Sequence, residues 1–530
     1  MMIDPRTVDF EVIERELAEF EAEERKRLGI EEEESHHWRD ANPQNFSQED
    51  KANTTILMGG LTVAHDQLFK AGMDGLGYKV ETLDCADLEA LRYGKEFGNR
   101  GQCNPTYFTV GNLVKHLTHL RDDQGLTPEE IVKKYVFFTA GACGPCRFGT
   151  YATEYRKALG DSGFEGFRVL LFQQQGGMKQ ATGESAGLDF NTKFYKTIVQ
   201  ITMLGDVINL AGYRIRPYEV NKGETDAALE ECKKIVGQAF AKQKSLVTAL
   251  LRCRKLLNRI EVNRLRPKPK VSIIGEFWAM TTEGDGNYRL QRFLEAEGAE
   301  VDIQPITAWV LYNIWEHQYD TRRRLPLRGE DEGNFGLKGK DGKKKLAMLW
   351  GAEKAVRAIF GLYTRAIGLE DYHLADMESV ATISHQYYNN HLRGGEGHME
   401  VGKLIQTVQK RKAHMVISVK PFGCMPSSGV SDGVQSLITS RYPEAIFTAI
   451  ETTGDGEVNV QSRIQMDLFK ARKRAEAEYE TAVAQTGLTP TALESKARRK
   501  AKAMHHPPHV VAGTAANQVL ELAGIREWSA

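Results

Sequence analysis

The order of apolar runs and helical patterns constrains the fold of this chain more than any other feature. An apolar run closed by glycines at residues 54–61 is followed by a helical pattern and a second apolar run at residues 78–84. The same order returns from residue 270 onward, after a long helical region. A strand, a helix and a strand in this order indicate a parallel sheet. We therefore predict an α/β protein with two similar parallel-sheet domains and helical extensions at both ends.

Changes in composition divide the chain into four predicted regions. The segment RPKPK (266–270) ends the long helical region and marks a domain boundary. Residues 322–345 are charged and rich in glycine, and we expect a surface loop there. The predicted regions are a charged helical N-terminal arm outside the core (1–53), a first α/β domain (54–265), a second α/β domain (266–466) and a helical C-terminal tail (467–530).

Charge and hydropathy exclude several classes of protein. The 530 residues carry 70 Lys and Arg against 71 Asp and Glu, a net charge of -1, which provides no field for gathering nucleic acid. No apolar run approaches the roughly 18 residues needed to span a membrane. The acidic N-terminal segment lacks the basic flank and apolar region of a secretory signal, so we expect a cytoplasmic protein. The 7 cysteines are too few for a disulfide framework.

Four of the cysteines fall where a strand pattern gives way to a helical pattern. Cys143 and Cys146 form a CxxC pair after the apolar run 134–140, and Cys424 follows the apolar run 415–420. Cys103 precedes an Asn-Pro pair that is typical of a helix start. Helix N-termini favour thiolate over thiol. Because ligands collect at the carboxyl ends of parallel strands, these four thiols are expected to converge there.

The spacing of these cysteines leaves three interpretations open. A CxxC pair with two distant cysteines suits a structural zinc ion or an iron–sulfur cluster, and the cysteines can also be buried residues that bind nothing. Small zinc modules usually bring two close pairs of ligands, which this chain lacks. The remaining cysteines are interpreted as packing residues: Cys85, Cys232 and Cys253.

Polar side chains with possible roles in catalysis gather around a glycine pair in residues 384–403. Such a mixture of acids, bases and a cation can protonate or hold a substrate, although a solvent-exposed loop with capping histidines explains it equally well. The candidate catalytic residues are His385, Tyr388, Arg393, Glu396 and His398, and the same stretch contains Tyr387, His391 and Glu400.

Other polar residues lie at the ends of predicted strands. Arg147, beside the CxxC pair, is a candidate cofactor-binding residue or a plain surface arginine. Asp285 and Asp455, in glycine loops, are candidate bases, but helix capping is the commoner role. Residues 173–180 either line a substrate cavity or form a strand-end loop.

Several of these segments carry a resemblance to a known family. They are CNPTYFTVGNLVKHL, YVFFTAGACGPCRFGTYATEYRKAL, FRVLLFQQQGG, RGGEGHMEVGK and KPFGCMPSSGVSDG. Together they resemble the 2-hydroxyacyl-CoA dehydratase and benzoyl-CoA reductase superfamily. The resemblance is closest to the cluster-bearing part of the large proteins related to acyl-CoA dehydratase activators, and covers residues 54–465.

The resemblance implies a [4Fe-4S] cluster between two Rossmann-like domains, or a double-cubane cluster as the variant. It also implies a separate ATP-hydrolysing iron–sulfur activator as partner and an acyl-CoA-type substrate. The chain itself is expected to form a homodimer or a heterodimer. The expected metal ligands are Cys103, Cys143, Cys146 and Cys424. Well-known dehydratase subunits use three cysteines, so a fourth ligand would close the cluster to substrate.

The expected function is the iron–sulfur component of an ATP-dependent, low-potential, anaerobic reductase or dehydratase. The chain lacks both an actin-like ATPase segment and a GxxxxGK[ST] motif, so ATP hydrolysis would come from the partner. The alternatives are a non-catalytic electron-relay or scaffold subunit and a structural zinc site in a hydrolase-like protein.

Overall fold

The computed structural model describes most of the chain. The described residues are Phe20, Glu24, Arg27 and the ranges 46–141, 146–173, 191–327, 341–392, 397–500 and 502–528. Contacts divide the chain into residues 1–41 and residues 42–530, and each part is considered by itself. Phe20, Glu24 and Arg27, the described residues of the first part, are helical.

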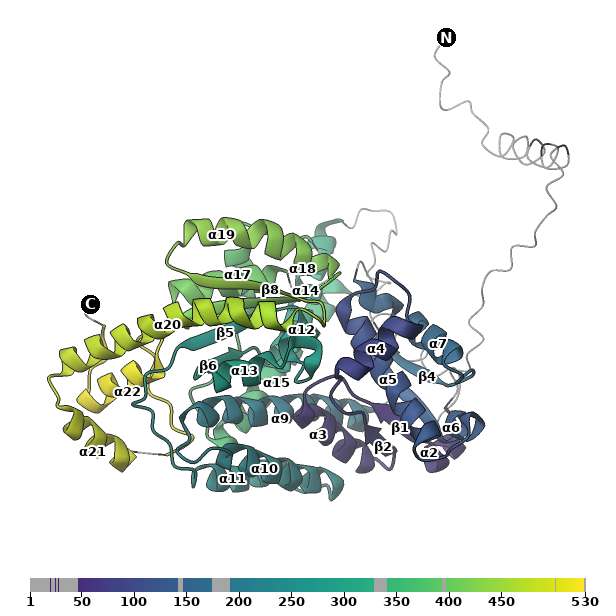
Figure 1. The fold of residues 1–530 in the computed structure, drawn as a ribbon, viewed down its shortest axis with the longest axis horizontal. Helices are drawn as coiled ribbons and strands as arrows, with labels where there is room; N and C mark the ends of the chain where they lie inside the picture. Colours follow the sequence, from purple (N-terminus) through teal and green to yellow (C-terminus); the bar gives the residue numbers. More distant parts are fainter. Residues whose placement is uncertain are drawn as a thin grey trace, which may run out of the picture. The chain divides into compact units, whose positions relative to one another are not determined.

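The first sheet has four parallel strands (Figure 1). They are β1 (Thr55–Met58), β2 (Lys79–Thr82), β3 (Tyr135–Gly141) and β4 (Val169–Gln173), in the order β2-β1-β3-β4. Each strand lies within or beside an apolar run of the sequence, and helices cover the sheet because buried parallel strands need cover on both faces. The helices of this first lobe are α2 (Gln48–Asn53), α3 (Val63–Asp74), α4 (Leu88–Phe97), α5 (Asn104–Asp122), α6 (Pro128–Lys134), α7 (Tyr151–Asp161), α9 (Thr192–Ile215), α10 (Glu224–Ala241) and α11 (Leu246–Leu257).

The second sheet repeats this topology. Its strands are β5 (Lys270–Gly275), β6 (Glu300–Ile303), β7 (Met415–Pro421) and β8 (Ile446–Thr452), all parallel, in the order β6-β5-β7-β8. The two sheets therefore confirm the predicted α/β class and are consistent with two Rossmann-like domains. The helices of this second lobe are α12 (Phe277–Thr281), α13 (Leu290–Ala296), α14 (Ile306–Arg324), α15 (Gly342–Ile367), α16 (Met377–Ser384), α17 (Gly397–Gln409), α18 (Met425–Gly429), α19 (Gln435–Arg441) and α20 (Glu457–Thr486).

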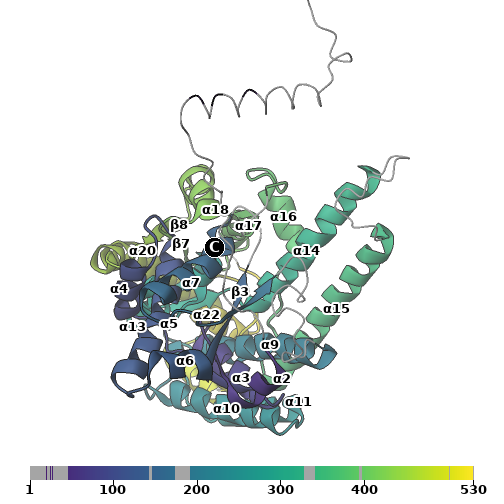
Figure 2. The ribbon, with the colours of Figure 1, turned by 90° about the vertical axis from the view of Figure 1, so that its right-hand side faces the viewer.

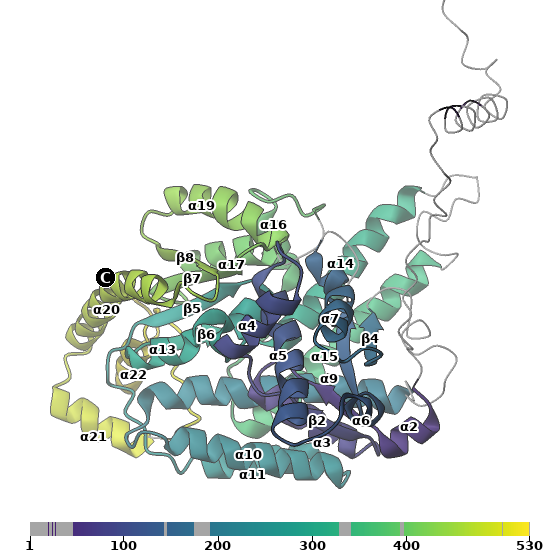
Figure 3. The same cartoon turned by 45° about the vertical axis from the view of Figure 1, so that its right-hand side comes forward.

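The largest hydrophobic core joins the two lobes. It contains buried residues of α3, α9, α10 and α11 from the first lobe together with residues of α14, α15 and α16 from the second. Helices α14 and α15 pack side by side, as two views show (Figures 2 and 3). A separate core fills the second lobe between its sheet, α13 and α20.

The terminal extensions differ from the sequence-based expectation. Phe46 is fully buried in the large core, and Asp50 of α2 forms an ion pair with Arg168 at 2.9 Å. The end of the predicted arm therefore belongs to the folded lobe. At the other end, α21 (Pro490–Lys500) and α22 (Thr514–Ala523) follow α20, and the buried Ala503 and Met504 between them join the large core.

The loop predicted for residues 322–345 is wrong at both of its ends. Helix α14 continues to Arg324 and α15 begins at Gly342, where the side chain of Asp341 accepts hydrogen bonds from the amides of Lys343 and Lys344. Residues 328–340 lie outside the described part. None of the described helices is long and apolar enough to cross a membrane.

Candidate functional site

The three described cysteines of the predicted set all precede helical turns. Cys103 is the N-cap residue of α5, and Cys146 is the N-cap residue of a short 3-10 turn (Arg147–Thr150) that leads into α7. Cys424 is the N-cap residue of α18, from which helical structure continues to Arg441. The predicted position at a helix start is confirmed for these three. Cys143 lies outside the described residues, in the gap 142–145.

The loops that carry Cys103, Cys146 and Cys424 meet at the junction of the two lobes. The amide of Asn104 donates to the carbonyl of Phe422 at 3.0 Å, which joins the start of α5 to the loop after β7. Gly423, at φ +77°, fills the space between the loops: a Cβ atom there would lie 3.2 Å from Cys103 Cα and 3.5 Å from Arg147 Nη1. Arg147 Nη1 also donates to the carbonyl of Gly101. We call this meeting point the cysteine junction.

Cys103 is surrounded by hydroxyl groups. Its Sγ atom lies 3.1 Å from Thr106 Oγ1 and 3.0 Å from the hydroxyl of Tyr151, and all three side chains are buried. Burial, followed by the neighbouring Cys103, raises the pKa of Tyr151 well above its usual value. Tyr151 therefore keeps its proton at neutral pH and can donate a hydrogen bond to a thiolate sulfur.

The environment of Cys424 opposes the expected thiolate. Burial raises the pKa of this thiol, and the carboxyl group of Glu276 raises it further, while hydrogen bonding by Ser427 acts in the opposite direction. The helix N-terminus is thus outweighed by desolvation at this position. Cys424 is a thiol at neutral pH, and metal binding would have to release its proton.

Glu276 is a site residue that sequence reasoning missed. It follows β5 and caps α12, its carboxylate accepting the amide of Ala279 at 2.8 Å. Burial raises its pKa, and its carboxyl group in turn acts on both Tyr151 and Cys424. The signal available in the sequence was its place directly after the strand that opens the second copy of the repeated unit.

Helix α17 directs its candidate residues to different places. Glu400 Oε1 accepts a hydrogen bond from Ser427 Oγ at 3.0 Å, which links α17 to the helix that begins at Cys424. Tyr388 is half-buried, and burial and the charge of Glu400 raise its pKa. His398, two residues before Glu400 on the helix, instead packs between Tyr312 and Trp315 of α14, with ring centroids 4.8 Å apart in both pairs. The structure therefore places Glu400 and Tyr388, and not His398, on the side of Cys424.

The remaining predicted residues are spread over several places. His385 is exposed at the end of α16, and its Nδ1 accepts the amide of Asn390 at 3.3 Å. His391 is exposed and hydrogen-bonds to the Tyr319 hydroxyl at 2.7 Å. Arg393 and Glu396, as well as residues 174–180, lie outside the described part of the chain.

The aspartates in glycine loops have structural roles. Asp285 Oδ2 accepts the amide of Leu88 at 3.1 Å and so caps α4 of the other lobe, while its Oδ1 pairs with Arg289 at 2.8 Å. Asp455 accepts the hydroxyl of Thr453 at 2.6 Å.

Two of the three remaining cysteines are packing residues as predicted. Cys232 and Cys253 are fully buried between α10 and α11. The prediction is wrong for Cys85, which is exposed because the chain leaves β2 at the sheet edge before reaching it.

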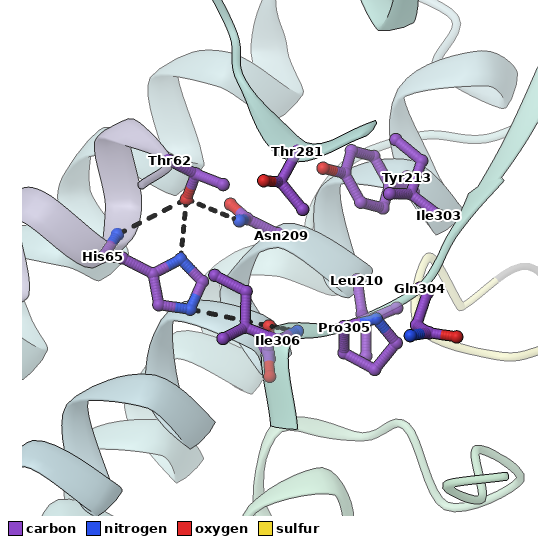
Figure 4. A pocket seen from close by; sticks show the side chains of 11 residues that line it. Thr62, His65, Asn209, Leu210, Tyr213, Thr281, Ile303, Gln304, Pro305 and Ile306 are labelled. Carbon is purple, nitrogen blue, oxygen red and sulfur yellow. Dashed lines mark hydrogen bonds and ion pairs between the residues drawn. The ribbon is translucent and has the colours of Figure 1, made fainter. Parts of the chain in front are cut away.

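A small polar cavity separates the two lobes beside α9 (Figure 4). It has a volume of about 10 Å³, room for one water molecule. On one side of it Thr62 Oγ1 lies 2.7 Å from His65 Nδ1 and 2.8 Å from Asn209 Nδ2. On the other, Asp206 accepts the amides of Ile306 and Thr307 at 2.8 and 2.7 Å and so caps α14. The hydrogen bonds between Asp206 and the start of α14 therefore join the two lobes beside this cavity.

The chemistry of the donors at the cysteine junction fits an iron–sulfur cluster. Thiols from both lobes lie on neighbouring loops, with the protonated hydroxyls of Tyr151 and Thr106 beside them, and such hydrogen bonds tune sulfur-ligated metals. Within the described residues, no three His, Cys, Asp or Glu side chains are arranged to hold a metal ion, and Cys143 is not among those residues. No protein-family model matches the chain, and no curated protein matches it.

Proposed function

We propose that this chain is the iron–sulfur component of an ATP-dependent, low-potential reductase or dehydratase that acts on acyl thioesters. Cys103, Cys143, Cys146 and Cys424 would hold a [4Fe-4S] cluster, and a separate ATP-hydrolysing activator would supply the electrons. The cluster would contribute one-electron transfer or, with one iron open, Lewis-acid chemistry on the substrate. The observation that carries the proposal is the meeting of the three cysteine loops at Gly423.

The protein's own residues have roles that follow from their contacts. Tyr151 would donate a hydrogen bond to the sulfur of Cys103, which stabilises the thiolate form of that ligand. Burial raises the pKa of Glu276, and its carboxyl group lies close enough to both Cys424 and Tyr151 to raise their pKa values. Tyr388, whose pKa burial and the charge of Glu400 raise, is the side chain that we propose as a proton donor to a bound substrate.

Iron analysis after anaerobic purification tests the ligand set. We expect about four irons per chain and broad absorbance near ~400 nm. Replacing any one of the four cysteines by serine should remove most of the iron. Cys253→Ser is the control, because Cys253 is buried, as Cys103 and Cys424 are, but lies in α11. A colourless protein containing zinc, or equal loss of iron in the control, contradicts the proposal.

The alternative function is a non-catalytic electron-relay or scaffold subunit of a larger redox complex. The presence of four candidate cysteines favours it, because four protein ligands leave no iron open to substrate. Electron paramagnetic resonance of the reduced protein distinguishes the two functions. A change of the signal on addition of acyl thioesters supports the enzyme, whereas an unchanged signal with reoxidation by a partner protein supports the relay.

A further inference from the structure

A second cavity lies at the carboxyl edge of the first sheet, apart from the cysteine junction. Gly59 and Gly60 follow β1 at this cavity, and Cys85 follows β2. Strand β1 lies between β2 and β3, so the chain leaves it toward one neighbour while β3 stands on the other side. Ligands of open parallel sheets bind at such a point. The cavity has a volume of about 20 Å³, room for a group the size of one or two water molecules.

The side chain of Asp66 lies in this cavity with an unused acceptor. Asp66 is 8% exposed, and its Oδ2 accepts the amide of Gly60 at 3.3 Å. Its other oxygen, Oδ1, accepts no hydrogen bond from any described residue. A buried carboxylate oxygen without a donor is costly, so this atom calls for a ligand that donates a proton or carries positive charge.

The charges around the cavity exclude an anion. The start of α3, where a phosphate would bind in a nucleotide-binding domain, is already occupied: the amide of Val63 donates to Glu283 Oε2 at 2.7 Å. Burial raises the pKa of Cys85, the negative charges of Glu283, Asp66 and Asp84 raise it further, and Arg289 acts in the opposite direction. The electrostatic potential at this edge of the sheet is therefore negative.

The walls of the cavity favour an ammonium group over a metal ion. The aromatic side chains of Phe137, Tyr155 and Trp278 line it, and each is buried. Aromatic faces attract ammonium groups, whereas hard metal cations require several oxygen ligands. Gly60, Asp84 and Cys85 are exposed and form an opening through which a ligand can extend.

We propose that this cavity binds an ammonium ion or the primary ammonium group of a small organic amine, with Asp66 as its counter-ion. The ammonium group would donate to Asp66 Oδ1 and lie against the aromatic walls. In an organic amine, the rest of the molecule would leave past Cys85. The lining of this cavity contains none of the proposed cluster ligands, so the amine site can be tested independently of the proposed function.

Thermal unfolding of the full chain with added amines tests the site. Ammonium chloride, methylammonium chloride and 1,4-diaminobutane are compared with sodium chloride and tetramethylammonium chloride at equal ionic strength. We expect a saturable rise of the unfolding midpoint with the first three salts only. A response to ammonium alone indicates the free ion, and a stronger response to the organic amines indicates the head group. Equal midpoints in all five salts overturn the proposal.

Two variants of α3 make the test specific. Asp66→Asn should weaken amine binding at least tenfold, as judged by the concentration that gives half of the rise. Asp74→Asn is the matched control, because Asp74 lies at the other end of the same helix, paired with Lys70 at 2.9 Å. Unchanged binding in Asp66→Asn overturns the proposal.

The pH dependence of the wild-type protein provides a second test if Asp66→Asn does not fold. Burial raises the pKa of Asp66 to about 6, against the opposing effects of His65 and the amides of Gly60 and Leu61; Glu283 raises it as well. Asp66 must be ionised to pair with an ammonium group, so affinity should fall about tenfold between pH 7 and pH 5. An affinity that is constant over this range overturns the proposal.

Discussion

His398 shows how a residue with a possible role in catalysis can be held for another reason. Its ring is 3% exposed and packs against Tyr312 and Trp315, and its Nε2 has no hydrogen-bond partner among the described residues. Burial lowers its pKa to about 4. His398 is therefore a neutral imidazole at physiological pH and cannot act there as a general acid.

Neutral burial of His398 makes the protein less stable in acid. The unfolded chain binds a proton at this histidine below about pH 6.5, but the folded protein does so only below about pH 4. The free energy of unfolding should therefore decrease as the pH falls from about 6.5 to about 4, at most by about 1.4 kcal/mol per pH unit from this group. Urea unfolding measured across this range tests the expectation.

The contribution of His398 can be separated from that of the other buried histidines. His506 is half-buried, and desolvation lowers its pKa to about 3, so the wild-type slope contains both contributions. His398→Phe keeps the aromatic packing and should reduce the slope between pH 6.5 and pH 4. His373→Phe, at an exposed position, should leave the slope unchanged. Equal slopes in wild type and His398→Phe would show that His398 titrates normally.

At the scale of elements, the close packing of α4 against α5 holds α5 in position, and with it Cys103 at the start of that helix. Two glycines allow the close approach. A Cβ atom at Gly94 would lie 1.9 Å from the carbonyl oxygen of Tyr107, and one at Gly111 would lie 1.8 Å from that of Ala90. Neither helix can accept a larger side chain there without moving.

Gly111→Ala should therefore separate α4 from α5 and destabilise the protein by about 2–4 kcal/mol. Gly160→Ala in α7 is the control, since no atom lies within 4 Å of the Cβ position, and alanine should be neutral or stabilising by up to about 1 kcal/mol. Urea unfolding midpoints give both values. A Gly111→Ala midpoint equal to that of Gly160→Ala would mean that the crossing is looser than described.

The elements themselves were largely predictable from the sequence. The apolar runs 54–61, 78–84, 134–140 and 415–420 located β1, β2, β3 and β7 to within a few residues, because buried parallel strands are rich in apolar residues. Helix α15 was not recognised, since the charged residues at its start resemble a loop until Asp341 is seen to cap it. The sequence also did not reveal that Cys85, which was interpreted as a packing residue, is exposed.

The site was predictable only in part. Strand-to-helix patterns placed Cys103, Cys146 and Cys424 at helix starts. Their meeting at Gly423 depends on how the two sheets face each other, which no local pattern contains. The opposite directions of His398 and Glu400 depend on the position at which α17 begins. Glu276 and Asp66 belong to no recognisable sequence motif, and only the structure shows that both are buried.

At the scale of the whole molecule, the shared core determines how the two lobes unfold. The apolar faces of α9 and α11 contact α15, and Arg264 at the end of the first lobe donates hydrogen bonds to the carbonyls of Lys502 and Ala503. Inter-lobe hydrogen bonds from Val63 and Leu88 add to this contact. The lobes therefore share a core, although each has its own sheet.

Residues 46–530 should unfold in one cooperative transition. Residues 46–265 should not fold alone, because the fragment exposes the apolar faces of α9 and α11 that the second lobe covers. Circular dichroism and tryptophan fluorescence during urea unfolding provide two probes of secondary and tertiary structure. Coincident midpoints are expected for the longer chain, and for the fragment a broad change without a midpoint. Two separate transitions in the longer chain, or a cooperative transition in the fragment, would instead mean that the first sheet and its helices are stable without the common core.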